Sequence, residues 1–553
     1  MAVLVASAPN SRASWCVPAA LALLTLTGCG KEAGEPTGTV LVAMADNSYS
    51  PSVVRVPVDS SIVFINTGRN IHNAIAVDKS WSSETTFGNI QMPSGTMTEI
   101  VFHERGAFPY YCSFHASPDG KVGMTGVVLV GDVEYSPGQA SERGLKAVAD
   151  FSGATRRVPQ EYPTIQNAVD AATPGDLVLV DRGVYVETVF VTTPSVTIRG
   201  VDRNDVVLDG RFTFGNGIMV GADAVAIENM TARNYTLNGF FWTGVKGFRA
   251  SYLTAYNNGD YGLYAFDATD GVFEHSYASG SPDAAFYVGQ CFPCRVVLDH
   301  VTGELSGLGY SGTNSGGDMY ILNSTFSRNK SGIATTTFDI ELLPPGRQTV
   351  IMGNVVTDND ARSLATSFYA TESLAGQGIV LAGTIDNRVE RNYVRGNSGH
   401  GIVLLPLNDR NYWPATGNVV RDNAVLDSGR ADIAAAGLGT IGNCFEGNRF
   451  GSSLPWGLQA MNGCSGLRLP LASDLSGYMG FLAGIASVRS ADFTPVDYKD
   501  REQPLAQPNM PGGADAKVVP AIHPFDDFRL DLSSIRTPGP AVPGVRSAQA
   551  GDH

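Results

Sequence analysis

Four residues in the first quarter of the chain have the types and the order that a copper ion in an electron-transfer role requires. Cys112 and His115 stand in the string YYCSFHASPDGKVGMTG, which ends just after Met124, and His72 lies 40 residues before the cysteine. One thiolate, two imidazoles and a weak axial thioether serve Cu(I) and Cu(II) in nearly the same geometry. The spacing therefore predicts a type 1 (blue) copper site with these four ligands, His72, Cys112, His115 and Met124. The competing interpretation is that the cysteine is half of a disulfide.

Residues 39–131 must position these ligands. They contain short apolar runs such as TVLVAMA, SSIVFIN, MTEIVF and TGVVLV, separated by Gly, Pro and Asn, which is typical of a small antiparallel β-sandwich. Cys112 and His115 would flank a tight turn after one strand. Met124 would return just before the last strand, and His72 would come from a neighbouring strand.

With this ligand order, residues 39–131 resemble the cupredoxin (plastocyanin/azurin-like) family. The resemblance implies one type 1 copper ion as the cofactor and one-electron transfer as the activity. It also implies that Asn73 hydrogen-bonds near Ser113 and braces the ligand loop. Eight residues separate His115 from Met124, a longer loop than in the smallest members of the family, which makes the Met the least secure ligand.

The N-terminus predicts export. Arg12 precedes an apolar run over residues 17–26, too short to span a bilayer, and the run ends in Leu-Thr-Gly-Cys29, which resembles a bacterial lipobox. We interpret residues 1–29 as a lipoprotein signal peptide with Cys29 as the lipidated residue, and residues 30–38 as a tether. The alternative is an ordinary secretory signal. Both place the protein outside the cytoplasm, in the periplasm or on the outer cell surface, with contact to a membrane through the lipid anchor only.

Charge limits the possible partners, and cysteine usage agrees with a location outside the cytoplasm. The formal net charge of −15 disfavours binding to nucleic acid or to anionic lipid through a basic surface. Beyond the signal and the copper motif, four of the seven cysteines remain. An even set in an oxidising compartment predicts two disulfides. A metal-binding role for the CFPC string would need further ligands. The paired residues would be Cys291 with Cys294 and Cys444 with Cys464.

After a linker at residues 132–158, the chain repeats itself over residues 159–455. Short strands and Asn-rich turns recur with a period in the low twenties, which indicates a solenoid, and the frame of a leucine-rich repeat is missing. The positions aligned as equivalent are Asn229, Ser251, His275, His300, Asn323, Asn354, Asn392, Asn423 and Asn448. The region resembles the right-handed parallel β-helix repeats of pectate-lyase-like proteins and of periplasmic copper-handling maturation proteins. Its opening string, YPTIQNAVDAATPGD, resembles that family's helical cap. Residues 456–553 are Pro-rich and are predicted to be irregular.

Three sets of side chains on the β-helix are candidates for binding or chemistry. Phe241, Tyr264, Tyr287 and Tyr310 follow one another at 23 residues, and would stack outward, either to fix the register of the coils or to bind a glycan. Asp260 and Asp283 would lie on adjacent coils, where they could share a cation. His275 and His300 could stack.

The sequence thus predicts an all-β protein and leaves three functions open. The first is a membrane-tethered copper protein that transfers electrons, with the β-helix as a docking scaffold for a redox partner protein, a copper enzyme or a surface glycan. The second is a polysaccharide lyase, hydrolase or epimerase with an accessory copper module. The third is copper storage or delivery, which requires an exchangeable metal.

Overall fold

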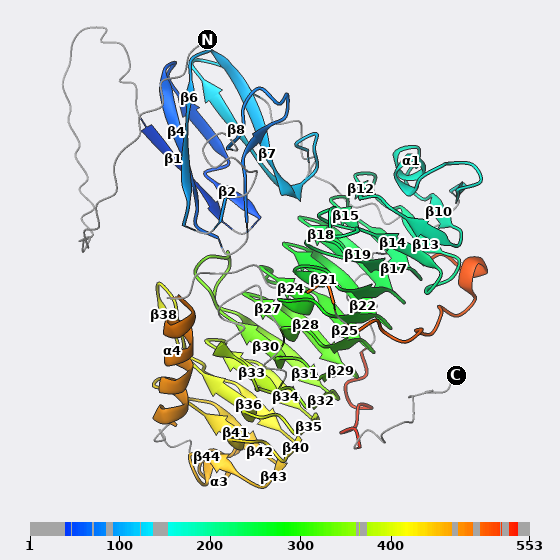
Figure 1. The fold of residues 1–553 in the computed structure, drawn as a ribbon. Coiled ribbons are helices and arrows are strands. Elements are labelled where there is room, and N and C mark those ends of the chain that lie inside the picture. The colour runs from blue at the N-terminus through cyan, green and yellow to red at the C-terminus, as the bar shows by residue number, and fades with distance from the viewer. Residues whose placement is uncertain are drawn as a thin grey trace, which may run out of the picture.

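The computed structural model shows an all-β protein made of two units, an N-terminal β-sandwich and a right-handed parallel β-helix (Figure 1). No helix in the described part of the chain is long and apolar enough to cross a membrane. The predicted signal, tether and lipidated Cys29 lie outside the described residues. The structure describes residues 39–45, 47–68, 71–83, 92–93, 95–121, 123–135, 153–360, 364, 373–466, 474–489, 498–500, 502–519, 521 and 530–539.

The sandwich consists of two four-stranded sheets, ordered β2-β1-β4-β6 and β3-β8-β7-β5. Alternate residues of each strand face inward and form a buried core between the two sheets. In β1 these residues are Val42 and Met44. The strand bounds are β1 (Thr39–Ala45), β2 (Ser48–Ser50), β3 (Val53–Val56), β4 (Ser60–Asn66), β5 (Ile75–Ala76), β6 (Met97–Phe102), β7 (Gly106–Ala116) and β8 (Gly123–Val130).

The β-helix stacks its coils into three parallel sheets of 12, 11 and 11 strands. The first sheet begins at β9 (Thr155–Val158), inside the predicted linker. Val158 is the one buried residue of this strand. The strand therefore has no apolar pattern that would predict it from the sequence. The second sheet runs from β11 (Gly183–Tyr185) to β43 (Arg449–Phe450). The third sheet bears on the candidate site and contains β12 (Val189–Val191), β15 (Ile218–Val220), β18 (Phe240–Thr243), β21 (Tyr261–Phe266), β24 (Ala284–Gly289), β27 (Leu308–Thr313), β30 (Ser331–Thr336), β33 (Ile379–Ala382), β36 (His400–Leu405), β41 (Ala431–Ala435) and β44 (Ser453–Leu454).

Helices close both ends of the solenoid. The predicted cap is α1 (Ile165–Asp170), whose N-terminus is capped by the Thr164 side chain accepting from the Asn167 backbone N–H. The C-terminal region is less irregular than predicted. It forms α3 (Leu458–Met461) and α4 (Leu475–Arg489), and α4 packs Tyr478 and Phe481 against the outer face of the third sheet.

Asparagine ladders hold the C-terminal coils together, although the predicted alignment of the repeats is partly wrong. Asn354, Asn392, Asn423 and Asn448 form one ladder with amide–amide bonds of 2.9–3.0 Å. Asn229, His275, His300 and Asn323 instead share a left-handed turn position one residue earlier in the coil. Ser251 belongs to neither set, because it pairs in the strand register with Glu228 and Glu274. Serines such as Ser324 take the ladder position in the earlier coils.

Two disulfides are present in the β-helix. Cys291 and Cys294 are joined within one turn, and Cys444 and Cys464 connect the last full coil to the segment after α3. The four cysteines that remain beyond the signal and the copper motif are therefore paired as the sequence predicted.

The predicted histidine pair also lies together in the β-helix. His275 and His300 stack with their ring centroids 5.2 Å apart.

The tail after α4 returns along the first sheet as an extended strap. Asn204 accepts from the backbone N–H of Gln507 and donates to its carbonyl, at 2.8 and 2.9 Å. Arg199 donates to the carbonyl of Ala516 at 2.5 Å, and Asn229 accepts from the N–H of Met510 at 2.8 Å. Side chains of the solenoid thus bond to backbone groups of the strap, as a neighbouring strand would.

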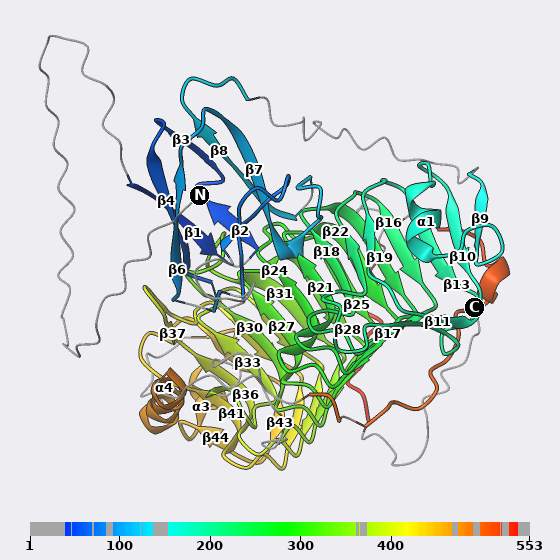
Figure 2. The same ribbon diagram turned by 45° about the horizontal axis from the view of Figure 1, so that its top comes forward.

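The sandwich sits against the third sheet, over its N-terminal half, while α4 covers the C-terminal half (Figures 1 and 2). Hydrogen bonds between the units join Asn47 to Tyr264 and Asn216 to the carbonyl of Phe114. The end of the sandwich that carries the predicted copper ligands therefore faces the β-helix.

Candidate metal centre

Three of the four predicted ligands come from two neighbouring strands of the sandwich. Cys112 and His115 lie within β7 itself, not in a turn after it, and Met124 lies on β8. Residues three apart on a regular strand point to opposite faces. The pairing of β7 with β8, however, shifts register between Tyr111 and Ala116, and this bulge turns the thiol and the imidazole toward the same point.

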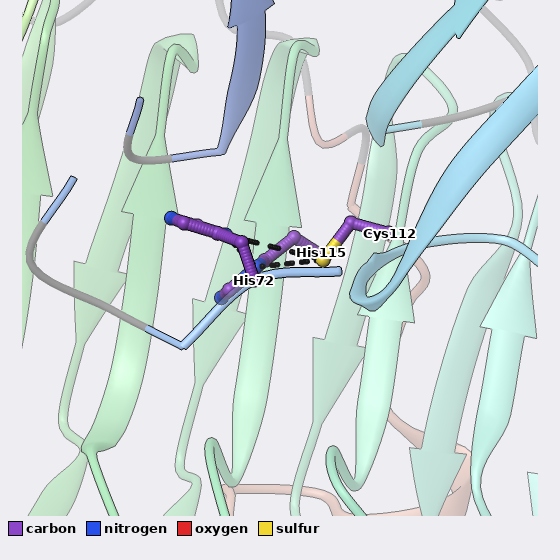
Figure 3. Close-up of side chains that lie close together, drawn as sticks. All are labelled: His72, Cys112 and His115. Carbon is purple, nitrogen blue, oxygen red and sulfur yellow. Dashed lines mark hydrogen bonds between the residues drawn. The ribbon is translucent and has the colours of Figure 1, made fainter. Parts of the chain in front are cut away.

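His72 reaches the same point from the segment before β5, where it forms an isolated bridge with Met92. The Nδ1 atoms of His72 and His115 are 3.1 Å apart, and Cys112 Sγ lies 3.9 Å from the first and 3.5 Å from the second (Figure 3). One ligand atom from each residue lies within 4.8 Å of the others. Two ring nitrogens and one sulfur thus converge as the donor set of a single small ion requires.

Burial and charge favour a thiolate at this position. Cys112 is fully buried, which raises the pKa of its thiol, but the charge of His115 and the hydrogen bonds from both imidazoles lower it more. The net effect brings the pKa of Cys112 down to about 5. The thiolate, which is the form that binds metal, is therefore the stable form at neutral pH.

Met124 is buried in the same core cluster as Cys112. The residue before it, Gly123, has a φ of +83°, and a Cβ there would lie 2.1 Å from the carbonyl oxygen of His115. Only glycine fits this close approach between the two ends of the ligand loop. Met124 therefore lies on the strand that pairs with the strand of Cys112 and His115, in the same core cluster as Cys112.

Asn73, next to His72, makes the two hydrogen bonds expected of a brace. Its Nδ2 donates to Ser113 Oγ at 2.8 Å, and its Oδ1 accepts from the Ser113 backbone N–H at 2.8 Å. The first bond joins the two side chains and the second fixes the backbone directly after Cys112. The segment that carries His72 is thereby tied to the strand that carries the sulfur.

We expect Asn73→Ala to destabilise the metal-free sandwich by about 2 kcal/mol, since it removes both hydrogen bonds between Asn73 and Ser113, each worth about 1 kcal/mol. Ser113→Ala, the matched control, loses only the side-chain bond and should cost about half as much. Thermal unfolding of the two variants without metal measures the difference. A loss at Ser113→Ala equal to that at Asn73→Ala would contradict the role of the brace.

The aromatic ladder of the β-helix is formed by three of the four predicted residues. Phe241, Tyr264 and Tyr287 occupy matching positions on β18, β21 and β24 and point outward, with the first two rings stacked at 4.6 Å and 13°. The prediction for Tyr310 is wrong, because it pairs with Phe286 and points into the core. All four are at most 1% exposed, so these rings present no open strip to a glycan.

The carboxylate and histidine pairs are also in place as neighbours. The Asp283 N–H donates to the Asp260 carbonyl on the previous coil, and Tyr261 OH donates to the Asp283 carboxylate at 2.5 Å. Both aspartates are buried and stand directly before strands of the third sheet, Asp260 before β21 and Asp283 before β24. His275 and His300 lie instead at a turn, where Asp299 pairs with His300 at 2.8 Å.

A further polar cluster, which the sequence analysis missed, lies between the third sheet and α4. His400 opens β36, contacts Gln377 Oε1 through Nδ1 at 3.0 Å, and places Nε2 3.7 Å from Asp474. Arg430 in turn donates to Asp474 at 3.1 Å. These four residues are between 23 and 97 positions from one another in the chain, so no local sequence motif reveals them.

Burial of His400, together with the charge of Arg430, lowers the pKa of its imidazole to about 4. In the unfolded chain the pKa returns to about 6.5. Between these two pKa values the unfolded chain binds a proton at His400 and the folded chain does not. The free energy of unfolding therefore falls as the pH drops from about 6.5 to about 4, by at most about 3 kcal/mol. In the His400→Gln variant, the midpoint of thermal unfolding should change less with pH over this range. An unchanged pH profile would show that another group controls it.

Residues 238–405 match the family described as right handed beta helix region. A purple cupredoxin from Nitrosopumilus maritimus is 24% identical, with a TM-score of 0.14, over 17% of this chain and 99% of its own. The A-module of the mannuronan C-5 epimerase AlgE4 from Azotobacter vinelandii is 13% identical, with a TM-score of 0.37, over 54% of this chain and 94% of its own. No curated protein sequence matches.

Proposed function

We propose that this chain is a copper protein whose sandwich binds one copper ion in a type 1 site and exchanges one electron through it. The observation that carries the proposal is the convergence of His72 Nδ1, His115 Nδ1 and Cys112 Sγ in a buried cluster. A site with one thiolate and two imidazoles binds copper when the fourth ligand is weak and zinc when the fourth ligand is strong. Met124 favours copper, because a thioether is a weak, soft ligand.

The residues present fit this cofactor. When bound, copper supplies the one-electron couple, and the chain supplies the setting for it. Burial excludes water from the ligands, the brace from Asn73 fixes the loop, and the bulge in β7 aligns Cys112 with His115. Such a preformed set of donors needs little rearrangement when the charge of the ion changes, which is what fast electron transfer requires.

The test is to add Cu(II) to the purified chain and to record the metal content and the visible spectrum. One copper per chain with an intense blue or purple absorption band, bleached by a one-electron reductant, is the expected result. Preferential binding of zinc, or copper bound without a visible band, would contradict the proposal.

The same proposal includes the location and the partners of the protein. It places the chain outside the cytoplasm, exported and lipidated at Cys29, where a redox partner protein or a copper enzyme would exchange electrons with it.

A second candidate is acid–base chemistry on an acidic polysaccharide by the β-helix. The observation that favours it is the cluster of His400, Asp474 and Arg430, which combines a neutral imidazole, a carboxylate and a guanidinium on the outer face of the solenoid. The likeness to the epimerase A-module concerns the fold alone. Incubation with polymannuronate and polygalacturonate, followed by NMR, tests it. Epimerised or unsaturated sugars that form with the chain but not with His400→Gln would support this activity.

A further inference from the structure

The copper-ligand end of the sandwich is in direct contact with the β-helix. The carbonyl of Phe114, which lies between Cys112 and His115 on β7, accepts a hydrogen bond from Asn216 Nδ2 at 3.1 Å. Asn216 precedes β15 in the β-helix, and Figure 3 shows the candidate ligands lying in front of the strands of this unit. A residue from a different unit thus holds the backbone between two of the ligands.

The β-helix orients Asn216 for this contact. Its Oδ1 accepts from Asn238 Nδ2 on the next coil at 2.8 Å, and its backbone carbonyl accepts from Thr188 Oγ1 at 2.8 Å. The amide oxygen is therefore engaged inside the β-helix, and the amide nitrogen points to the sandwich. Asn216 and Asn238 are 4% and 1% exposed, so the contact lies in the interior of the molecule.

Met219 of β15 packs against the opposite end of the ligand loop. A Cβ added to Gly123, the residue before Met124, would meet Met219 Cε at 3.0 Å. Ser117, two residues after His115, lines with Phe190 and Met219 a crevice that is too narrow for water. Both ends of the loop from His115 to Met124 are therefore against β12 and β15.

A second polar contact lies farther along the same sheet. Asn47, at the turn between β1 and β2, donates to Tyr264 OH at 2.6 Å. The ring of Tyr264 is stacked on Phe241 at 4.6 Å and on Tyr261 at 4.3 Å, so its hydroxyl is held in place. The sandwich is thus fixed to the β-helix at two separate points, one at the ligand loop and one at the aromatic ladder.

We propose that the β-helix forms the second half of the copper site: the surface around Asn216 and Met219 holds the ligand loop and closes the copper end, so that exchange of copper, and of electrons with other proteins, requires the two units to separate. The inference rests on the proposed function. The three candidate ligands His72, Cys112 and His115 are at most 1% exposed, so a docking protein meets none of them. Contacts of this kind within a chain resemble transient interfaces and open reversibly.

In the open state, a reduced protein partner passes one electron to Cu(II), which becomes Cu(I), while the partner is oxidised by one electron and no bond or proton is transferred. In the closed state, the β-helix occupies the place of that partner. Because electron transfer rates fall steeply with distance, closure slows the reaction with large donors.

The test compares Met219→Glu with Met479→Glu. The first places a carboxylate at the interface, whereas the second adds the same charge to α4, where Met479 is 61% exposed. In the metal-free chain, Met219→Glu should speed hydrogen exchange at the amides of Ser113–Ser117 by about tenfold, the equivalent of roughly 1.4 kcal/mol of docking free energy. In the copper-loaded chain, capture of Cu(I) by bathocuproine disulfonate and reduction by a reduced c-type cytochrome should rise by about the same factor.

The control Met479→Glu should match the parent chain in all three measurements. Should Met219→Glu fail to fold, Asn216→Ala removes the bond to Phe114, together with the bond that its Oδ1 accepts from Asn238, and should raise the exchange rate by about fivefold. Equal rates in the interface variants and the control would overturn the inference. Lack of a visible band in the parent chain would instead overturn the proposed function, and the hydrogen exchange of the metal-free chain would still decide the inference.

Discussion

In the copper-loaded chain, Cys112→Ser is expected to abolish the intense visible absorption band and to weaken copper binding beyond the roughly 10–100-fold that loss of an outer-shell partner costs. The reason is that the band and much of the affinity come from the thiolate, and a hydroxyl at this position keeps its proton at neutral pH. Equilibrium titration with Cu(II), followed in the visible spectrum, measures both effects.

The matched control removes sulfur elsewhere. Cys291→Ser with Cys294→Ser takes away the disulfide of a β-helix turn and leaves the sandwich untouched, so the band should be unchanged. Far-ultraviolet circular dichroism should show an intact β-helix in the Cys112→Ser variant. Survival of the band in Cys112→Ser would show that another residue is the source of the colour and that the ligand set is wrong.

The largest loss of stability is expected from Glu228→Ala. Glu228 is fully buried on β16 (Val225–Glu228), where its carboxylate accepts from Arg199 Nε at 2.7 Å and also pairs with Arg249. Removal of one partner leaves the 1%-exposed guanidinium of Arg199 without its counter-charge, which typically costs 3–5 kcal/mol. The midpoint of denaturant unfolding, followed by circular dichroism, should fall accordingly.

An exposed ion pair on the same solenoid serves as the control. Arg395 and Asp427 pair at 2.8 Å while both side chains are more than half exposed, so Asp427→Asn should cost less than about 1 kcal/mol. Equal effects of the two substitutions would mean that the solenoid accommodates an unpaired Arg199, for example by release of the strap that this residue holds through Ala516.

The sequence was sufficient to predict the candidate ligands because ligand type and order are local features of the chain. It did not predict how β7 presents them. Cys112 and His115 are three residues apart within one strand, and only the bulge opposite β8 brings them together. A bulge depends on pairing with another strand, so apolar periodicity in the strand itself does not reveal it.

The solenoid was predictable as a fold, whereas its register was only partly so. The constant spacing of 23 residues suggested four outward aromatic rings, but the coil between β24 and β27 is one residue longer, as the pairing of Tyr287 with Ser311 shows. Because successive residues of a strand face opposite sides, one added residue turns Tyr310 inward. The same kind of one-residue shift separates Asn323 from the ladder that begins at Asn354.

Long-range contacts were beyond the reach of sequence reasoning. The bond from Asn216 to Phe114 joins residues 102 positions apart, and the bonds from Arg199 to the strap span more than 300. Nothing in the strings around these residues indicates a partner, since Asn and Arg are common on any solenoid turn. The bond from Asn216 to Phe114 nevertheless helps to place the copper end of the sandwich against the β-helix.

X-ray absorption spectroscopy at the copper edge of the loaded, full-length chain tests the central claim most directly. The account predicts one sulfur neighbour at the short distance of a thiolate and two imidazole nitrogens around each ion, from Cys112, His72 and His115. A first shell of nitrogen and oxygen alone, without sulfur, would contradict it.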